Sequence, residues 1–378
     1  MKITELEFWP IRIPYNAPYT TSRGTVRQAE GVVIRVATES GVTGAGEASF
    51  LFPDRSGETI ETVPEILQHR LGPLMIGRDA SDIDGIMGEF DRACGEQYTF
   101  PYSRAAIDIA LHDLLGKARG VSVAELLGGV FRSTLKVGRS IPILPVDELA
   151  DVARALCDEG YRGLTLKGSA DWRGDIERFI AVRRATDDAY PLEIDPNQAY
   201  SVEEAIEVAR ALEPHGICNI EQPIAWWDLP GLARVTAATS VRIAADEAVM
   251  CSADVANIAR LGAANMVTIK LARVGGIREA SRMVDVARAA GLACNMGSKH
   301  TFGVGTAAIL HFCAARGHIE EPIGYGAPLE RFVDDVIEDE IPFAQGIASL
   351  PTGAGLGVTL SEEKLARYVV GEKRVVRK

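Results

Sequence analysis

The chain has 378 residues, of which 47% are hydrophobic, 24% charged and 6% aromatic, and its formal net charge is −12 at pH 7. This balance excludes a disordered chain, and the acidic excess excludes a nucleic-acid backbone as a default partner, so we expect a small-molecule ligand. The length exceeds that of a usual single domain, so we expect two structural units or one barrel with additions.

The N-terminal stretch MKITELEFWPIRIP alternates charged and apolar residues, and no apolar run of the sequence is long enough to cross a bilayer. The six cysteines lie far apart and form no C-x-x-C pair, so we predict reduced thiols. We therefore expect a cytoplasmic protein without a membrane partner.

The first third of the chain predicts a small α+β unit. ITELEFWPIRI and EGVVIRVATE alternate in the manner of strands, and the glycine-rich turn SGVTGAGEA follows them. AAIDIALHDLLGKARG has apolar residues at helical spacing and ends in glycine, so it predicts a helix.

From about residue 135 onward, short apolar runs alternate with amphipathic helical patterns. The runs are LTLK, PLEID, CNIE, VRIAAD, NMVTIK and LACNM. Strands that alternate with helices indicate parallel βαβ units. The first five runs end, at intervals of 28, 26, 25 and 24 residues, at Lys167, Asp195, Glu221, Asp246 and Lys270. This steady period predicts a (β/α) barrel.

Three successive runs end in a carboxylate: Asp195, Glu221 and Asp246. One such residue alone is more often a helix N-cap, but in a barrel the three would meet at the mouth, where like charges cannot all stay ionised without a cation. Mg²⁺ prefers oxygen ligands and leaves positions for water or substrate oxygens. We predict a site for Mg²⁺, or for Mn²⁺, that binds a substrate carboxylate.

Lys167 and Lys270 are the predicted acid and base. A lysine after a strand is by itself more often a solvated loop residue. In an eight-stranded barrel, however, the second and sixth strands lie on opposite sides of the mouth, so these two amines would face each other across the substrate. One can remove a proton from the carbon next to the carboxylate, the metal can stabilise the resulting enediolate, and the other lysine can return the proton.

Short segments along nearly the whole chain resemble the enolase superfamily, specifically the mandelate racemase/muconate lactonizing enzyme group and its muconate lactonizing branch. The segments are GAGEA, AAIDIALHDLLGKARGVSVAELLGG, LK, IDPNQAY, NIEQP, AADE, IKLARVGGI and GAGLGV. Each is short, but their order and spacing make the resemblance specific.

The resemblance implies an α/β fold, a modified TIM barrel of the (β/α)7β type, with an N-terminal α+β capping domain. We predict the capping domain at residues 1–127, the barrel at residues 128–328, and a C-terminal segment, residues 329–378, that returns to the capping domain.

By position, the three carboxylates match the family's Mg²⁺ ligands and the two lysines match its catalytic pair. Asn197 falls where the family has a polar residue near the metal. Glu247 should face away from the metal by strand alternation, where it would support a lysine instead.

The sequence departs from the family pattern in three places. Thr165 replaces the first lysine of the K-x-K motif, so Lys167 lacks its usual neighbouring cation. Lys299 and His300 follow the seventh strand, where they would bind a second anionic group or act as an extra acid. The tripeptide around Tyr325 replaces the D-x-D signature of dipeptide epimerases, so we do not expect a dipeptide substrate.

Two capping-domain segments, YNAPYTTSRG and SFLFPDR, match the loops that determine specificity in the family. Tyr19 and Arg23 would contact a polar substrate, and Phe50 and Phe52 would exclude water from the enolate. Packing within the loops is the alternative for each of these residues.

We therefore predict a Mg²⁺-dependent isomerase, a racemase, epimerase or cycloisomerase, that abstracts the proton α to a substrate carboxylate through an enolate intermediate. A hydroxy-acid dehydratase is the first alternative, because Lys299 or His300 could protonate a leaving hydroxyl. A non-catalytic, metal-bound binding protein is the second, because the K-x-K motif is incomplete. The sequence does not determine the oligomeric state, and a homo-oligomer is compatible with it.

Overall fold

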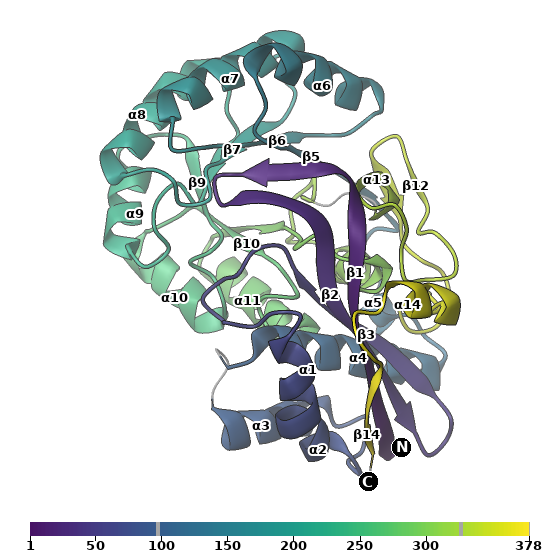
Figure 1. Cartoon of the computed structure of the whole chain (residues 1–378). Coiled ribbons are helices and arrows are strands. Elements are labelled where there is room, and N and C mark those ends of the chain that lie inside the picture. Colours follow the sequence, from purple (N-terminus) through teal and green to yellow (C-terminus); the bar gives the residue numbers. More distant parts are fainter. Residues whose placement is uncertain (96–98, 325–327, 378) are drawn as a thin grey trace.

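The computed structural model describes residues 1–95, 99–324 and 328–377. They form an antiparallel sheet with helices packed against it, and a curled parallel sheet whose helices line its outer face (Figure 1). This arrangement confirms the predicted class, an α/β modified TIM barrel with an N-terminal α+β cap.

The capping sheet has four antiparallel strands in the order β14-β1-β2-β3. Their bounds are Ile3–Thr21 (β1), Gly24–Thr38 (β2), Thr43–Phe50 (β3) and Arg374–Arg377 (β14). Glu5 pairs with Arg377, so the two ends of the chain lie side by side (Figure 1). The far ends of β1 and β2 extend from this sheet toward the barrel.

Helices cover the capping sheet, and α4 lies directly against β3. Their bounds are Thr62–Ile66 (α1), Leu67–Leu71 (η1), Gly72–Met75 (α2), Ile83–Cys94 (α3), Pro101–Arg119 (α4) and Val123–Leu126 (α5). The glycines of β3 permit this contact, because a Cβ at Gly44 or Gly46 would lie only 2.1 Å or 1.9 Å from a backbone oxygen of α4.

The barrel sheet consists of seven parallel strands that neighbour one another in chain order. Their bounds are Arg139–Ile141 (β5), Leu164–Lys167 (β6), Leu192–Asp195 (β7), Asn219–Glu221 (β8), Arg242–Ala245 (β9), Met266–Ile269 (β10) and Ala293–Met296 (β11). Lys167 therefore ends the second strand and Lys270 follows the sixth.

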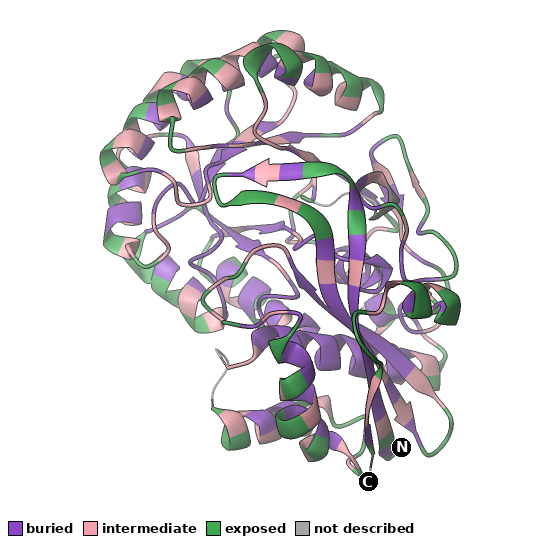
Figure 2. Cartoon of the chain, viewed as in Figure 1, coloured by how far each residue is buried: buried purple, intermediate pink, exposed green. Residues whose placement is uncertain are grey.

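The connecting helices α6 to α11 bury one side against the sheet and expose the other (Figure 2), which explains their amphipathic pattern. The bounds of the connecting helices are Val146–Asp158 (α6), Trp172–Ala185 (α7), Val202–Leu212 (α8), Glu213–His215 (η2), Leu229–Ala237 (α9), Ser252–Leu261 (α10), Ile277–Ala289 (α11) and Gly303–Ala315 (α12). Helix α12 differs, because nearly all of its residues are buried. Among the described helices, none has both the length and the hydrophobicity needed to cross a bilayer.

Residues 319–324 occupy the eighth position of the barrel, between the first and seventh strands. Ile319 bridges to Cys294 of β11, and Ile323 bridges to Val137 just before β5, both in parallel orientation. These bridges close the gap between the two edges of the seven-stranded sheet.

The C-terminal part of the chain packs beside the barrel and then returns to the capping sheet through β14. Its other elements are Pro328–Arg331 (α13), Phe343–Ala344 (β12), Ile347–Ser349 (β13) and Glu362–Tyr368 (α14). Strand β13 pairs with β12 and with Thr134–Lys136 (β4), which precedes the barrel strands. The exact boundaries proposed from the sequence, at residues 127/128 and 328/329, stay a prediction.

Candidate active site

A cavity opens at the carboxyl end of the barrel strands, beneath the capping segments. It is lined by eleven of the residues predicted from the sequence: Tyr19, Arg23, Thr165, Lys167, Asp195, Asn197, Glu221, Asp246, Lys270, Lys299 and His300. The βα period thus brought residues from successive strands to one place, because the carboxyl ends of parallel strands share an edge.

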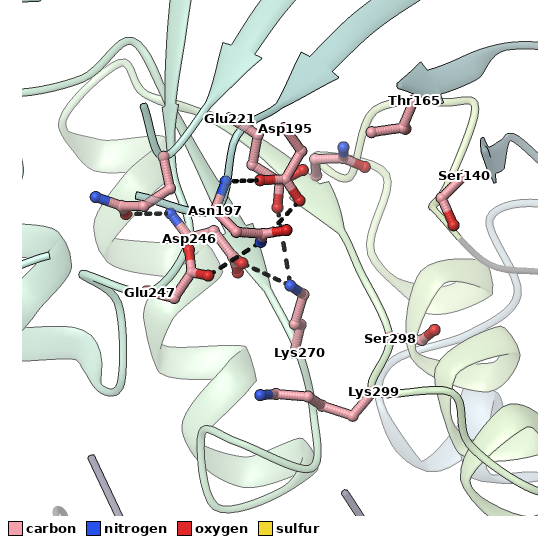
Figure 3. Close-up of polar contacts among 12 residues, drawn as sticks. Ser140, Thr165, Asp195, Asn197, Glu221, Asp246, Glu247, Lys270, Ser298 and Lys299 are labelled. Carbon is pink, nitrogen blue, oxygen red and sulfur yellow. Dashed lines mark hydrogen bonds and ion pairs between the residues drawn. The ribbon is translucent and has the colours of Figure 1, made fainter. Parts of the chain in front are cut away.

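Lys270 and Arg273 neutralise one carboxylate of the cavity, that of Asp246. Lys270 Nζ lies 2.6 Å from Asp246 Oδ2 and 3.8 Å from Glu221 Oε1 (Figure 3). Arg273 donates to Asp246 Oδ1 and to its carbonyl oxygen, both at 2.6 Å. Burial would raise the pKa of the Asp246 carboxyl, but Arg273 and Lys270 outweigh that effect and hold the pKa below its usual range.

Lys167 contacts a second carboxylate on the neighbouring strand. Its Nζ donates to Asp195 Oδ2. Burial opposes the charge of the amine, yet Asp195 more than compensates, so the pKa of Lys167 is raised. The pKa of Lys270 is also raised against burial, by Asp246 and Glu221. As the chain stands, both lysines are therefore protonated, and a base function requires added positive charge near them.

Glu221 is the carboxylate of this group with the least compensation. Burial raises the pKa of Glu221 well above its ordinary value, and the neighbouring Asp195 and Asp246 raise it further. In the described part of the chain, no three His, Cys, Asp or Glu side chains form a ready group for a metal ion; the two lysine ammonium groups lie against the carboxylates instead. Three buried carboxylates on adjacent strands, of which Glu221 has the least compensation, are nevertheless a donor set that suits a hard divalent cation.

Asn197 connects two acidic residues of the cavity. Its Nδ2 donates to Asp195 Oδ2 at 3.0 Å and to Glu247 Oε1 at 3.1 Å (Figure 3). Glu247 therefore lines the cavity, contrary to our expectation from alternation. Strand β9 ends at Ala245 and the chain turns after it, so alternation no longer determines the direction of the side chain.

Thr165 faces the barrel interior, where it joins a buried polar group. Its hydroxyl donates to Glu193 Oε1, and Asn219 Nδ2 donates to Glu193 Oε2 at 2.6 Å. Burial raises the pKa of Glu193. The position of the missing K-x-K lysine is thus taken by a hydroxyl and a carboxyl group beside Lys167.

Lys299 is paired within the cavity wall. Its Nζ lies 3.3 Å from Asp54 Oδ2, an oxygen that also accepts from the hydroxyl of Tyr102. Burial lowers the pKa of Lys299 to about 8, although Asp54 opposes the shift. The pair connects the capping segment that contains Asp54 to the loop after β11.

His300 is neutral and is oriented by Tyr15. The Tyr15 hydroxyl lies 2.6 Å from His300 Nδ1, within hydrogen-bond distance, and burial raises the pKa of that phenol. Burial lowers the pKa of His300 well below its ordinary value, and Arg331 and Lys167 add to the shift.

The capping segments supply part of the cavity wall. Tyr19 donates to Ser140 Oγ at 2.8 Å, and Arg23 donates to the carbonyl oxygen of Pro53. Phe52 lines the cavity, whereas Phe50, also predicted to contact substrate, lies in the capping core with its ring 5.1 Å from that of Tyr102.

The difference between the two phenylalanines has a structural reason. Phe50 is the last residue of β3 and pairs with Glu30 of β2, so its side chain is fixed in the capping sheet. Phe52 lies beyond the strand and turns toward the cavity. Tyr325, the remaining predicted contact, lies outside the described residues.

The sequence reasoning missed several lining residues, among them Ser140 and Arg331. Ser140 lies on the first barrel strand, at the position that pairs with Thr165. If the βα period is continued 26 residues back from Lys167, it reaches Ile141, the last residue of that strand. The period could therefore have located the strand that contains Ser140. For Arg331, in the segment after the eighth position, the sequence offers no comparable signal.

Two family descriptions match the chain. "Mandelate racemase / muconate lactonizing enzyme, N-terminal domain" matches residues 4–128, and "Enolase C-terminal domain-like" matches residues 148–364. Muconate cycloisomerase 1 of Rhodococcus opacus is 30% identical over 372 residues, which cover 97% of this chain and 98% of that protein.

Solved structures are similar over the same length. The N-succinyl Arg/Lys racemase from Bacillus cereus has a TM-score of 0.95 and 28% identity, with 100% of both chains covered. A dipeptide epimerase from Cytophaga hutchinsonii, complexed with Mg and the dipeptide D-Ala-L-Val, has a TM-score of 0.92 and 27% identity, again with 100% of both chains covered.

Proposed function

Because the chain belongs to the mandelate racemase/muconate lactonizing enzyme group of the enolase superfamily and is an isomerase of that superfamily, we propose that it moves a proton at the carbon next to a carboxylate of a small-molecule substrate. The proposed reaction is a racemisation, an epimerisation or a cycloisomerisation, and the proposed cofactor is Mg²⁺ or Mn²⁺.

The arrangement of the two lysines around the carboxylates carries this proposal. Lys167 ends the second barrel strand and Lys270 follows the sixth, so they approach the cavity from opposite sides. Asp195, Glu221 and Asp246 come from the strands between them. A substrate carboxylate placed at the three acidic residues would have its α-carbon within reach of both amines.

The three carboxylates are the groups that would hold the metal ion. When bound, a divalent cation would supply positive charge that stabilises the enolate of the substrate and favours the neutral form of a neighbouring lysine. Asn197 fixes the orientation of Asp195 through its side-chain and backbone N–H groups, so this ligand is held in place before substrate binds.

Each lysine would act on one face of the α-carbon. One amine takes the α-proton, and the ammonium group on the opposite side donates a proton to the other face, which inverts the configuration; the reverse reaction exchanges the two roles. Gly297 leaves room for this, because a Cβ at that position would lie 2.6 Å from Lys270 Cε.

The capping segments would exclude water from the reaction. Leu51 and Phe52 line the cavity from the capping side, and the Lys299–Asp54 ion pair joins this segment to the barrel at 3.3 Å. An apolar cover lowers the local dielectric constant, which strengthens the interaction of the lysines with a developing negative charge.

The test is α-proton exchange in D₂O. A library of chiral carboxylates is incubated with the purified protein and Mg²⁺, and deuterium at the α-carbon is followed by NMR and mass spectrometry. We expect at least one compound to gain deuterium without a loss of mass from elimination. The Lys167→Ala/Lys270→Ala double variant is the control, and its exchange should fall by roughly 10²- to 10⁴-fold.

The alternative functions predict different results in the same experiment. A hydroxy-acid dehydratase releases water from its substrate, so the product loses the mass of one water molecule, and substitution of its acid, by Lys299→Met or by His300→Gln, should then abolish the reaction. The ion pair of Lys299 with Asp54 favours the isomerase over this alternative. A protein that only binds ligands would give no exchange with any compound that it binds, and that outcome would refute the proposed function.

A further inference from the structure

A second cavity lies at the amino ends of the barrel strands. It has a volume of about 190 Å³, and among its lining residues are the first residues of five successive strands: Leu164, Leu192, Asn219, Arg242 and Met266. Cys218 and Glu320, which are both exposed, also line it. This amino-end cavity therefore opens to solvent at the end of the barrel opposite the capping segments.

The amino-end cavity and the active-site cavity meet inside the barrel. Thr165, Glu193, Asn295 and Gly324 line both of them. The same residues therefore border a space that leads to the catalytic lysines and a space that leads to solvent.

The residues at this meeting point belong to a polar layer inside the barrel. The polar layer consists of six residues that line one or both cavities: Ser140, Thr165, Glu193, Asn219, Thr268 and Asn295. Strand pairing places the first four side by side on β5 to β8 and the last two side by side on β10 and β11. Bulky branched side chains ordinarily fill such layers. Hydroxyl, amide and carboxyl groups at this depth require hydrogen-bond partners that apolar packing does not supply.

One half of the polar layer finds its partners within the protein. Glu193 accepts hydrogen bonds from the hydroxyl of Thr165 and from Asn219 Nδ2, the latter at 2.6 Å. This group lies directly beneath Lys167, because Thr165 precedes that lysine by two residues on the same strand.

The other half of the polar layer, beneath Lys270, is left with unused groups. Thr268 is 1% exposed, and its hydroxyl makes no hydrogen bond with the described residues. Within the same part of the chain, the side chain of Asn295 makes one hydrogen bond, in which Oδ1 accepts the N–H of Met296 at 2.7 Å. Its Nδ2 donors thus lack a protein partner. Buried polar groups of this kind are ordinarily bound to water.

Both cavities have room for water on either side of the polar layer. The active-site cavity has a volume of about 70 Å³ and the amino-end cavity about 190 Å³, whereas one water molecule requires roughly 15 Å³ measured in this way. A water molecule also needs two to four polar partners, and the hydroxyl, amide and carboxyl groups of the layer provide them.

We propose that a chain of water molecules occupies the polar layer and connects the active-site cavity with solvent at the amino ends of the strands. Water and its protons then reach the active site while the capping segments cover a bound substrate. The water chain itself does not depend on the proposed function, but its role in catalysis rests on it.

That role follows from the proton balance of the proposed reaction. In each turnover one lysine gains the α-proton and the other lysine loses a proton to the product. Before a second turnover in the same direction, the first lysine must release its proton to water and the second must take one from water. No proton is gained or lost overall, and the water chain provides a route that does not require the capped mouth to open.

The first test is structural and independent of catalysis. Crystal structures at high resolution are compared for the unchanged protein with Mg²⁺, for Thr268→Val and for Asn295→Leu. Asn265→Leu is the matched control, because Asn265 binds the N–H of Ile243 and lines neither cavity.

We expect ordered water at Thr268 Oγ1 and Asn295 Nδ2, continuing past Glu193 into the amino-end cavity, in the unchanged protein and in the control. Each of the other two variants should lose the water bound at its own position. Thr268→Val has nearly the same shape as the original residue, which covers the case in which Asn295→Leu does not fold. A layer without ordered water between the cavities, or water that is unchanged in both variants, would overturn the proposal.

The second test blocks the amino-end cavity far from the lysines. N-ethylmaleimide is attached to the exposed Cys218, and Cys218→Ser treated in the same way controls for reaction at other thiols. Two rates are measured with a substrate found by the exchange experiment. One is the conversion of a single enantiomer at saturating concentration, and the other is the passage of a carbon-13 label between the enantiomers in an equal mixture.

The two rates should respond differently to the block. In an equal mixture, forward and reverse turnovers restore the lysines for each other, so no route to solvent is needed. We expect the label to pass within about twofold of its original rate, and the conversion of the single enantiomer to slow by roughly tenfold, the effect of about one lost hydrogen bond. An unchanged conversion rate, or an equal loss in both rates, would contradict the role in catalysis.

Failure of this inference and failure of the proposed function can be told apart. Ordered water in the polar layer of a protein that exchanges no α-proton with any carboxylate would contradict only the proposed reaction. Exchange of α-protons by a protein whose polar layer is dry would contradict only this inference.

Discussion

Two sets of buried carboxylates differ in what surrounds them. The first set lies where the capping sheet meets the barrel. Glu47 accepts the backbone N–H groups of Phe302 and Gly305 at the start of α12, both at 2.7 Å. Asp108 accepts the N–H group of Ile277 at the start of α11, at 2.6 Å. Each carboxylate thereby attaches the N-terminus of a barrel helix to the capping part, a position that favours negative charge.

At the barrel mouth the carboxylates instead face one another and two lysines. Asp195 contacts Lys167 and Asp246 contacts Lys270, whereas the charged form of Glu221 is destabilised by burial and further by its acidic neighbours. The contrast teaches that burial alone does not mark a functional carboxylate. Backbone N–H groups bind both junction carboxyl groups, although Oδ1 of Asp108 has no hydrogen-bond partner among the described residues. The mouth residues are arranged to receive charge from a ligand.

Among the substitutions that test this comparison, Glu221→Gln at the barrel mouth should have the largest effect. Because the substitution removes a ligand, we expect Mg²⁺ affinity to fall by at least about 100-fold. Without metal, we expect the variant to unfold at a higher temperature than the unchanged protein, because a mutual repulsion of like charges has been removed. Calorimetric titration with Mg²⁺ and thermal unfolding in a chelator measure the two effects, and lower stability of the metal-free variant would contradict the comparison.

Asp108→Ala should have the opposite effect on stability. It removes the carboxylate oxygen that accepts the N–H groups of Ile277 and Arg278 and leaves both buried donors without this acceptor, so we expect the free energy of unfolding to fall by about 1–3 kcal/mol. Urea unfolding monitored by circular dichroism measures this change. Mg²⁺ affinity should stay within about twofold, and a large loss of affinity would show that the two regions are not separable.

Gly297→Ala should affect activity more than stability. The added Cβ would lie 2.6 Å from Lys270 Cε, and this flexible end of the side chain can move away at little cost to folding. Because Lys270 would then be displaced from its position, we expect α-proton exchange to fall by about tenfold. Exchange rates and melting temperatures of the variant and the unchanged protein provide the check; unchanged exchange would argue against the placement of Lys270.

The protonation of His311 should have the smallest of the expected effects, a pH-dependent change in stability where the capping part meets the barrel. Its Nδ1 accepts the N–H of Ala124 at 3.3 Å, its Nε2 lies 3.1 Å from the carbonyl oxygen of Leu356, and burial lowers its pKa from 6.5 to about 4. Between pH 6.5 and 4 the unfolded chain binds a proton that the folded chain excludes, so acidification removes stability.

We expect His311 to contribute a loss of about 1 kcal/mol between pH 6.5 and 5.5. Urea unfolding of the unchanged protein and of His311→Gln at several pH values isolates this contribution as a difference between the two curves. Parallel curves over this range would contradict the assignment.

The regular part of the fold could be predicted from the sequence. The βα period predicted the strands from Leu164–Lys167 to Met266–Ile269, and with them the five residues at their carboxyl ends. Period and position determine such residues because parallel strands end at one edge of the sheet.

The irregular part could not be predicted in the same way. The side-chain direction of Glu247 follows from the turn after β9, and the position of Arg331 follows from how the C-terminal segment packs beside the eighth position. Glu193 and Asn219 could have been found, since each lies two residues before a strand-end carboxylate and must therefore share its inward face.

The most direct test of the central claim uses Lys167→Ala and Lys270→Ala separately, each with the two enantiomers of a substrate, in D₂O with Mg²⁺. If the lysines act on opposite faces, each variant should lose the interconversion of enantiomers, and each should retain α-proton exchange for one enantiomer only, the opposite one in the two variants. Loss of exchange for both enantiomers in one variant, with full activity in the other, would contradict the two-lysine mechanism.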